Sequence, residues 1–367
     1  MSDRLDRARG ALIGLASGDA VGFPAMYHRQ IAVPARRRFL WSRGVESDAA
    51  LVNKLTLPYS ASASLETMAF GATDDAEQAA LAAQMLLCLG DDPTTDELFD
   101  AWFRHVDPQH DVLWGSVADR SAIRNARAGL RAPETGNDNP HHYDDSSVAR
   151  SVPVGIRWAG DPERAAAVAR RMASITNADI GIDGAAAFAA AIATAVGGGD
   201  IGRAIDAARR QVGGDTWTAR KWALAETVVT AEGSLFAAIP RFHNEVSNLE
   251  YGFGNVVAET LPLAFVIARE SRTFAEALGL AAMVPKQADT MPAMVGALIG
   301  ATAGVDAIPE SWRTAIDELR GICVPSTRGF RLAEIASQLL DAGDRDGTQS
   351  MTPVGPGARG TKEEART

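Results

Sequence analysis

The sequence predicts an all-α protein, and three observations support this fold class. The chain is rich in alanine and leucine and has few runs of β-branched residues, which favours helices packed through small side chains. Apolar residues recur at helical spacing, and no strand-like alternation extends beyond a few positions. The 367 residues are 46% hydrophobic and show no clear interdomain linker, so they can form one large core. We expect a single helical domain over residues 1–342.

Start and stop signals place the expected helices in order along the chain. Residues 161–175 show them well, with Asp161 at the N-cap, Pro162 in the first turn and Glu163 at the positive end of the helix dipole. The expected helices cover residues 3–17, 75–89, 94–106, 116–129, 161–175, 183–196, 200–211, 218–231, 255–269, 273–284, 291–303, 309–320 and 330–341. Residues 343–367 are polar and rich in glycine and proline, which predicts a disordered tail.

Glycines recur every four residues in two of these helices. Gly10, Gly14, Gly18 and Gly22 form one stripe, and Gly296, Gly300 and Gly304 form the other. Glycine inside a helix costs about 0.5–1 kcal/mol relative to alanine, so a stripe on one face indicates close backbone approach. Asp19 adjoins the first stripe and Asp289 the second. We expect both helices at the centre of the bundle, with these acidic ends near a common cleft.

Composition and charge exclude some classes of function. The net charge of −10 argues against non-specific nucleic-acid binding, although the basic stretch 34–43 could form either a salt-bridged loop or an anion contact. The chain has neither an apolar run of about 18 residues nor a signal-peptide pattern, so no membrane segment is expected. Cys88 and Cys323 lie in apolar contexts and are expected to be buried free thiols. These features predict a cytoplasmic protein; they do not indicate an oligomeric state.

The segment Thr73-Asp74-Asp75 directly precedes a long alanine-rich helix and has two interpretations. The first is helix capping, in which Asp74 and Glu77 form a variant of the capping box. The second is a site for a hard cation, because carboxylate and hydroxyl oxygens are the ligands that Mg²⁺, Mn²⁺ and Ca²⁺ prefer. The two are compatible, since one helix start can do both.

A second polar region spans residues 136–150. It contains His141, His142, Asp144, Asp145 and Ser146, which could form a hydrogen-bonded loop or could grip the hydroxyls or base of a substrate. The adjacent histidines lack a third histidine or cysteine at ligand spacing, which argues against a transition-metal site. Residues 174–184 add further polar side chains, among them Asn177 and Asp179.

Four segments in order resemble the ADP-ribosylglycohydrolase family, which includes the dinitrogenase-reductase-activating glycohydrolase and crystallin J1-type proteins. They are the Gly-Asp-Ala opening of residues 9–25, the Thr-Asp-Asp segment of 72–81, the Arg-x-x-Pro-x-Gly region of 146–181 and the glycine-spaced stretch 286–312 that ends in Ile-Pro-Glu-Ser-Trp. The resemblance covers about residues 8–340. It implies a compact orthogonal helical bundle with a two-metal centre that usually holds Mg²⁺ or Mn²⁺.

Carried over by position, the resemblance implies that the metal ligands are Thr73, Asp74, Asp75, Asp289 and Thr290. Met26 and Gln287 stand where the family usually has carboxylates, and in the family both of those carboxylates serve the same metal. A thioether and a neutral amide are poor replacements for a hard cation. We therefore expect at most one tightly bound Mg²⁺ or Mn²⁺ per chain.

The resemblance implies a glycoside hydrolase that cleaves an N- or O-ribosidic bond, with an ADP-ribose conjugate as the family default. Asp74, Asp75 and Asp289 are the expected catalytic carboxylates, around an oxocarbenium-like transition state. Two alternatives stay open: a divergent enzyme for a nucleoside or another small glycoside, and a catalytically silent protein that binds ADP-ribose or a nucleotide. The expected substrate-binding residues are Asp19, His141, His142, Asp144, Asp145, Ser146, Asn177 and Asp179.

Overall fold

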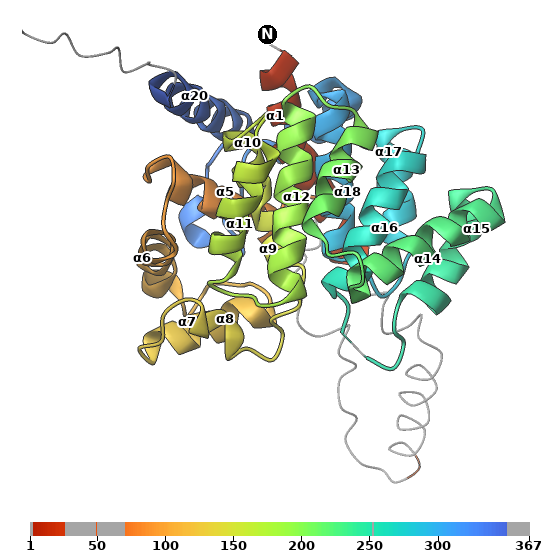
Figure 1. Cartoon of the computed structure of the whole chain (residues 1–367), viewed down its shortest axis with the longest axis horizontal. Helices are drawn as coiled ribbons and strands as arrows, with labels where there is room; N and C mark the ends of the chain where they lie inside the picture. Colours follow the sequence, from red (N-terminus) through yellow and green to blue (C-terminus); the bar gives the residue numbers. More distant parts are fainter. Residues whose placement is uncertain (1–2, 26–48, 50–69, 252, 351–367) are drawn as a thin grey trace, which may run out of the picture.

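The computed structural model describes residues 3–25, 49, 70–251 and 253–350. Over these ranges the chain is helical, and its only extended pairings are two isolated bridges, between Asp144 and Val256 and between Glu318 and Arg331. Figure 1 shows α10, α11, α12 and α13 running roughly side by side, with helices such as α14 and α20 lying across them, and no sheet in the part of the chain that is described. The predicted all-α class is confirmed.

Most expected helices appear within a few residues of their predicted bounds. The α-helices are α1 Asp3–Ala25, α5 Asp74–Leu87, α6 Thr95–Val106, α7 Val117–Arg127, α8 Glu134–Asn137, α9 Ser146–Arg150, α10 Val152–Arg157, α11 Pro162–Ala173, α12 Ile180–Val196, α13 Ile201–Gln211, α14 Trp217–Glu232, α15 Leu235–Arg241, α16 Val257–Glu270, α17 Phe274–Ala282, α18 Thr290–Ala303, α19 Glu310–Ile316 and α20 Leu332–Ser350. A π-helical turn, Phe242–Val246, and 3₁₀ turns at Asp107–Gln109, Val305–Ala307 and Pro325–Thr327 complete the described elements. The sequence missed α8, α9, α10 and α15 because helices of four to seven residues are too short to show a periodic pattern.

The two glycine stripes form the contact between α1 and α18. A Cβ atom on Gly14 would overlap the carbonyl oxygen of Gly296, and a Cβ on Gly10 would overlap that of Gly300. The same holds for Gly22 against the carbonyl of Asp289, just before α18 begins. Only glycine permits this approach, so the prediction of close central packing is confirmed. The contact brings the end of α1 beside the start of α18.

Helix α12 packs against both α1 and α18. It also contacts α10, α11 and α13 (Figure 1). It is alanine-rich and buried on nearly all faces, as expected for a helix surrounded by others. Its Phe188 meets Phe265 of α16, with ring centroids 6.0 Å apart. One contiguous hydrophobic core runs from α1 to α20.

The C-terminal helix corrects one prediction. Residues 343–350 were expected in a disordered tail, but α20 continues to Ser350. Leu339, Leu340 and Ala342 are buried, and Gly343 lies so close to the carbonyl of Arg157 that a Cβ would overlap it. The glycine that suggested a tail therefore serves helix packing. Residues 351–367 lie outside the described part of the chain.

Several smaller expectations can also be compared with the structure. Both cysteines are free thiols, but Cys88 is exposed rather than buried, whereas Cys323 is buried as expected. Within the described ranges, none of the helices combines the length and apolarity needed to cross a membrane. Met26 and the basic stretch 34–43 lie outside the described residues.

Candidate active site

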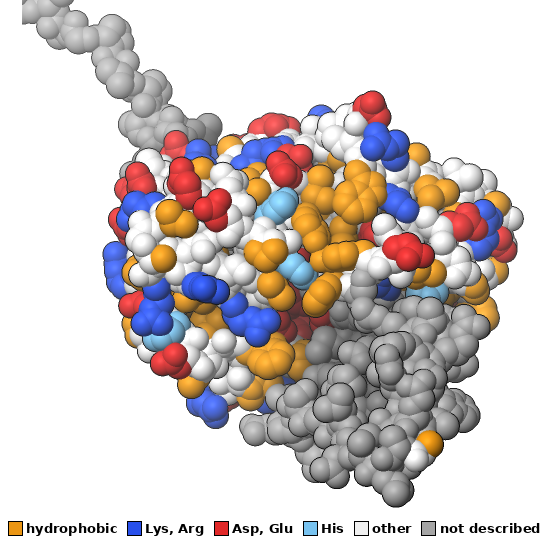
Figure 2. Space-filling model, turned by 90° about the horizontal axis from the view of Figure 1, so that it is seen from below, with side chains coloured by type: hydrophobic (Ala, Val, Ile, Leu, Met, Phe, Trp, Pro, Cys, Tyr) orange, Lys and Arg blue, Asp and Glu red, His pale blue; other side chains and the backbone are white. Residues whose placement is uncertain are grey.

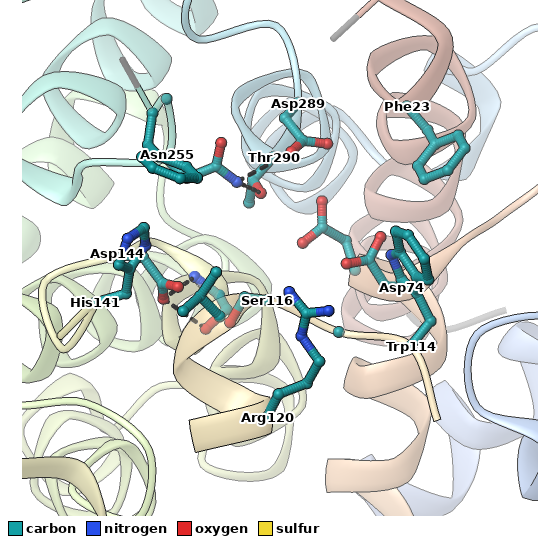
Figure 3. A pocket seen from close by; sticks show the side chains of 16 residues that line it. Phe23, Asp74, Trp114, Ser116, Arg120, His141, Asp144, Asn255, Asp289 and Thr290 are labelled. Carbon is teal, nitrogen blue, oxygen red and sulfur yellow. Dashed lines mark hydrogen bonds between the residues drawn. The ribbon is translucent and has the colours of Figure 1, made fainter. Parts of the chain in front are cut away.

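A pocket of about 160 Å³ opens where α1, α5, α7, α9 and α18 meet three loops. Figure 3 shows its side chains converging from these elements, and Figure 2 shows recessed acidic side chains with hydrophobic side chains beside them. The lining residues are Phe23, Asp74, Asp75, Trp114, Gly115, Ser116, Val117, Arg120, His141, Asp144, Ser146, Phe253, Gly254, Asn255, Asp289 and Thr290. Residues far apart in the sequence thus share one cavity.

The three predicted catalytic carboxylates line this pocket together. Asp74 and Asp75 begin α5, and Asp289 is the residue before α18. Burial, and next the Asp289 carboxylate, raise the pKa of Asp74 well above its ordinary value. Burial, followed by Asp19 and Asp74, raises the pKa of Asp75 in the same way. The carboxylates are therefore close enough to repel one another in a poorly solvated place.

Asp19 and Thr73 support this acidic group from behind the pocket. The Asp19 carboxylate accepts hydrogen bonds from the Thr73 hydroxyl, the Thr73 N–H (2.8 Å) and the Ala76 N–H (3.1 Å). Asp19 thereby caps α5 from another helix, and burial raises its pKa to about 7. Neither residue lines the pocket, although Asp19 was expected to bind substrate and Thr73 to bind metal.

The predicted capping box between Asp74 and Glu77 is wrong. The N-cap of α5 is Thr73, whose side chain makes no capping hydrogen bond, and Asp19 takes that role instead. Glu77 is buried and accepts from the N–H groups of Ile322 (3.0 Å), Cys323 (2.8 Å) and Val324 (2.7 Å). The Cys323 carbonyl in turn accepts from Trp114 N–H at 2.7 Å, so Glu77 helps to hold one pocket wall.

Asn255 connects the start of α18 to the loop before α16. Its side-chain amide donates to Asp289 Oδ2 at 3.1 Å and to Thr290 Oγ1 at 3.2 Å. Its backbone has φ of 66°, a left-handed conformation that asparagine tolerates better than most residues. Its carbonyl accepts from Asp145 N–H at 2.9 Å. Sequence reasoning gave Asn255 no role, because this link exists only in the folded chain.

Of the predicted substrate loop, His141, Asp144 and Ser146 line the pocket. Asp144 Oδ1 accepts from the Ser146 hydroxyl at 2.7 Å and from the Asn177 side-chain amide at 3.1 Å. Burial, and next the charge of Asp119, raise the pKa of Asp144. The His141 ring lies 4.7 Å from that of Phe253, edge to face.

The remaining predicted substrate-binding residues lie outside the pocket lining. Asp145 is fully buried, and burial, followed by the Asp144 charge, raises its pKa to about 8. Asn177 is buried behind Asp144. Asp179 has an exposed side chain 3.4 Å from His142 Nε2, so this pair lies at the surface. The polar pattern therefore identified the right loops but not which side chains face the cavity.

Gln287 stands at the position where the resemblance implies a carboxylate ligand of a second metal. It also lies outside the pocket lining. Its side-chain amide donates to Glu259 and, at 3.3 Å, to the Ser247 hydroxyl. Glu259 and Lys286 form a buried ion pair of 2.9 Å beside it. Gln287 thus belongs to a buried polar cluster, where a neutral amide adds no further charge to the Glu259–Lys286 ion pair.

The donors in the pocket can be compared with the needs of a metal ion. Asp74, Asp75, Asp289 and the Thr290 hydroxyl present only hard oxygen atoms, the ligand type that suits Mg²⁺ or Mn²⁺. Their repulsion, seen in the raised pKa of Asp74, is the charge that a cation would relieve. Within the described residues, no three His, Cys, Asp or Glu side chains form a preassembled metal-binding group. The donor chemistry fits, and metal dependence stays a prediction.

Several pocket residues were missed by sequence reasoning, among them Phe23, Trp114, Ser116, Arg120 and Phe253. Ser116 and Asp119 form a capping box at the start of α7, a pattern that could have been read from the sequence. Trp114 and Phe253 are large exposed aromatic side chains, but exposure cannot be read from residue type.

The sequence profile of a family described as ADP-ribosylglycohydrolase matches residues 1–348. The ADP-ribosylarginine hydrolase Tri1 of Pseudomonas putida (strain GB-1) is 25% identical over 321 residues, which is 84% of this chain and 73% of that protein. A solved ADP-ribosylglycohydrolase-related protein complex aligns with a TM-score of 0.60 at 22% identity, covering 94% of this chain and 100% of the other. At 22% identity, the similarity to this solved structure shows a shared fold and no more.

Proposed function

Because the chain belongs to the ADP-ribosylglycohydrolase family and is a hydrolase of glycosidic bonds, we propose that it cleaves the ribosidic bond of an ADP-ribose conjugate. The observation that carries the proposal is the convergence of Asp74, Asp75 and Asp289 in one pocket. The relationship to an ADP-ribosylarginine hydrolase makes an N-linked arginine conjugate the first substrate to assay.

The pocket residues can supply the chemistry of this reaction. Cleavage at an anomeric carbon develops positive charge on the sugar ring, which nearby carboxylates stabilise. One of the three aspartates accepts a proton from the attacking water as the bond to the leaving group breaks. Asn255 holds the Asp289 carboxylate by donating to Oδ2, which keeps this group directed into the pocket.

We also propose that the enzyme requires Mg²⁺ or Mn²⁺. Asp74, Asp75, Asp289 and Thr290 would hold the ion, with Thr73 behind them bonded to Asp19. When bound, the ion would orient the ribose hydroxyls and the water. A single tight ion is expected, because Gln287 is neutral and its amide is bonded to Glu259 and Ser247.

The test combines a metal titration with a product assay on the full chain. We expect one Mg²⁺ or Mn²⁺ per chain by calorimetry, release of ADP-ribose from ADP-ribosylarginine, and loss of this activity in EDTA. Asp74→Asn and Asp289→Asn are expected to lower kcat by about 100-fold or more, because each removes a charge that stabilises the transition state. Both variants should also weaken cation binding.

Asp215→Asn is the matched control. Its side chain is 96% exposed and pairs only with Arg220 among the described residues, so activity should not change. Full activity of Asp74→Asn and Asp289→Asn would contradict the proposed site. Hydrolysis of a free nucleoside but not of any ADP-ribose conjugate would replace the proposed substrate class with the nucleoside alternative. Activity that survives EDTA, with no ion bound, would refute the metal requirement alone.

A further inference from the structure

The charges that line the pocket are distributed unevenly. Four aspartates line it, Asp74, Asp75, Asp144 and Asp289, whereas Arg120 is the one lysine or arginine among its described lining residues. Figure 3 shows Arg120 rising from α7 on the side opposite Asp289 and Thr290. A ligand with both a sugar to be cleaved and an anionic group would therefore meet opposite charges at two places.

Neighbouring residues fix the backbone at Arg120, whereas its guanidinium forms no ion pair within the described residues. Ser116 and Asp119 cap α7 reciprocally, with 3.1 Å between Asp119 Oδ2 and Ser116 N and between Asp119 N and Ser116 Oγ. Asp119 also forms a buried ion pair with Arg150, which fixes the first turn of α7 against the core. The charge of the Asp119 carboxylate is thus neutralised by Arg150 and not by Arg120.

The Arg120 side chain is exposed to the pocket and has no hydrogen bond or ion pair within the described residues. By contrast, Arg150 has two side-chain partners, Asp119 and Thr176. A positive group on a fixed backbone, facing a cavity whose other lysine, arginine, aspartate or glutamate side chains are all aspartates, is available to bind an anionic ligand. The guanidinium suits phosphate in particular, because its planar fork can donate two parallel hydrogen bonds.

We propose that Arg120 is a specificity-determining residue that binds a phosphate group of the substrate, while the acidic side of the pocket receives the ribose whose bond is cleaved. This assignment rests on the proposed function and adds a residue and an orientation to it. Asp74, Asp75 and Asp289 repel a diphosphate, so an ADP-ribose conjugate needs a cationic contact outside this group. Arg120 supplies that contact without belonging to the acidic group.

The experiment compares three variants by calorimetry, with the nucleotide titrations at one fixed Mg²⁺ concentration and a separate Mg²⁺ titration of each variant. Arg120→Gln removes the charge, Arg120→Lys keeps it without the planar fork, and Arg124→Gln removes the same charge one turn further along α7, outside the pocket lining. The probes are ADP-ribose and ADP, which carry phosphates, and adenosine, which carries none. Thermal unfolding checks that each variant is folded, which is expected because both arginines are exposed.

We expect Arg120→Gln to weaken ADP-ribose and ADP binding by about 10- to 100-fold, the effect of losing hydrogen bonds to a charged group. Arg120→Lys should fall between this variant and the unmodified protein, and Arg124→Gln should bind within about twofold of it. The Mg²⁺ affinity of Arg120→Gln should be unchanged or tighter, because a positive charge has left the pocket. A merely structural role would weaken Mg²⁺ and phosphate ligands together.

Three results would overturn the assignment: unchanged ADP-ribose binding in Arg120→Gln, equal weakening of ADP-ribose and adenosine, or no binding of ADP-ribose and ADP by the unmodified protein. Failure of the proposed function looks different. Arg120-dependent binding of ADP-ribose without hydrolysis of any conjugate would refute the proposed reaction and support the assignment. Hydrolysis that is indifferent to Arg120→Gln would refute the assignment alone.

Discussion

The two sides of the pocket are built by different means. The side formed by α1, α5 and α18 carries Asp74, Asp75 and Asp289, and it rests on glycines that bring helix backbones into contact. The side formed by residues 114–120, 141–146 and 253–255 rests on buried polar clusters such as Arg150 with Asp119 and Lys286 with Glu259. One side depends on shape and the other on paired charges. Mutations should therefore damage them differently.

The largest effect is expected at the glycine contact. Gly14→Val would place side-chain atoms on the carbonyl of Gly296, and both partners are helix backbone that cannot move aside separately. We expect a loss of more than about 5 kcal/mol of unfolding free energy, which would leave the chain unfolded. Circular dichroism and yield of soluble protein measure this.

Gly279→Ala is the control for helix glycine itself. Gly279 lies within α17, and a Cβ there would meet nothing within 4 Å. This change should raise the unfolding free energy by about 0.5–1 kcal/mol, because alanine favours the helix. A folded Gly14→Val with near-normal stability would show that the glycine contact is not needed.

A smaller loss is expected on the polar side. Glu259 accepts from Asn248 N–H at 2.9 Å and pairs with Lys286, so it attaches the loop before α16 to the core. Glu259→Gln removes the negative charge that pairs with the buried Lys286 ammonium and should cost about 3 kcal/mol in urea unfolding. The double change Glu259→Gln with Lys286→Met should restore part of this. A double variant no more stable than the single one would refute the charge explanation.

The smallest effect on stability is expected where the two sides meet, at Asn255. Asn255→Gly keeps the left-handed backbone but removes the amide that donates to Asp289, so the proposed cation should bind about tenfold more weakly. Asn255→Ala should weaken the cation equally and be about 1 kcal/mol less stable than Asn255→Gly, because alanine strains at this φ. Calorimetry and urea unfolding separate the two effects. Equal stability of the two variants would show that backbone strain is unimportant here.

Much of the first side could be predicted from sequence. The four-residue spacing of Gly10 to Gly22 and of Gly296 to Gly304 is a local pattern with one physical meaning, and the α1–α18 contact confirms it. The acidic pair Asp74-Asp75 and the distant Asp289 were expected to share a cleft, and they line one pocket. Asp19 was expected nearby, but its carboxylate faces Thr73 and Ala76 instead.

Little of the second side could be predicted. Asp144, Asn177 and Asp179 are similar polar residues in the sequence, yet the first lines the pocket, the second is buried behind it and the third is at the surface. Glu77 illustrates the same limit, because its local spacing suggested a capping box while its partners are 245 to 247 residues away. A polar side chain has several possible partners, and the nearest along the chain is often not the one it finds.

The sequence by itself determined the helical class, the central glycine contact and the acidic residues of the pocket. Each follows from a repeat or a cluster whose physical consequence is local: helical spacing buries one face, and a glycine stripe admits another backbone. The tertiary structure alone decided that Asp19 caps α5, that Gln287 joins Glu259 and Lys286, and that the Arg120 side chain faces the pocket with no partner among the described residues. These outcomes depend on which charges and donors burial brings together. Competition for partners is settled only when the helices have packed.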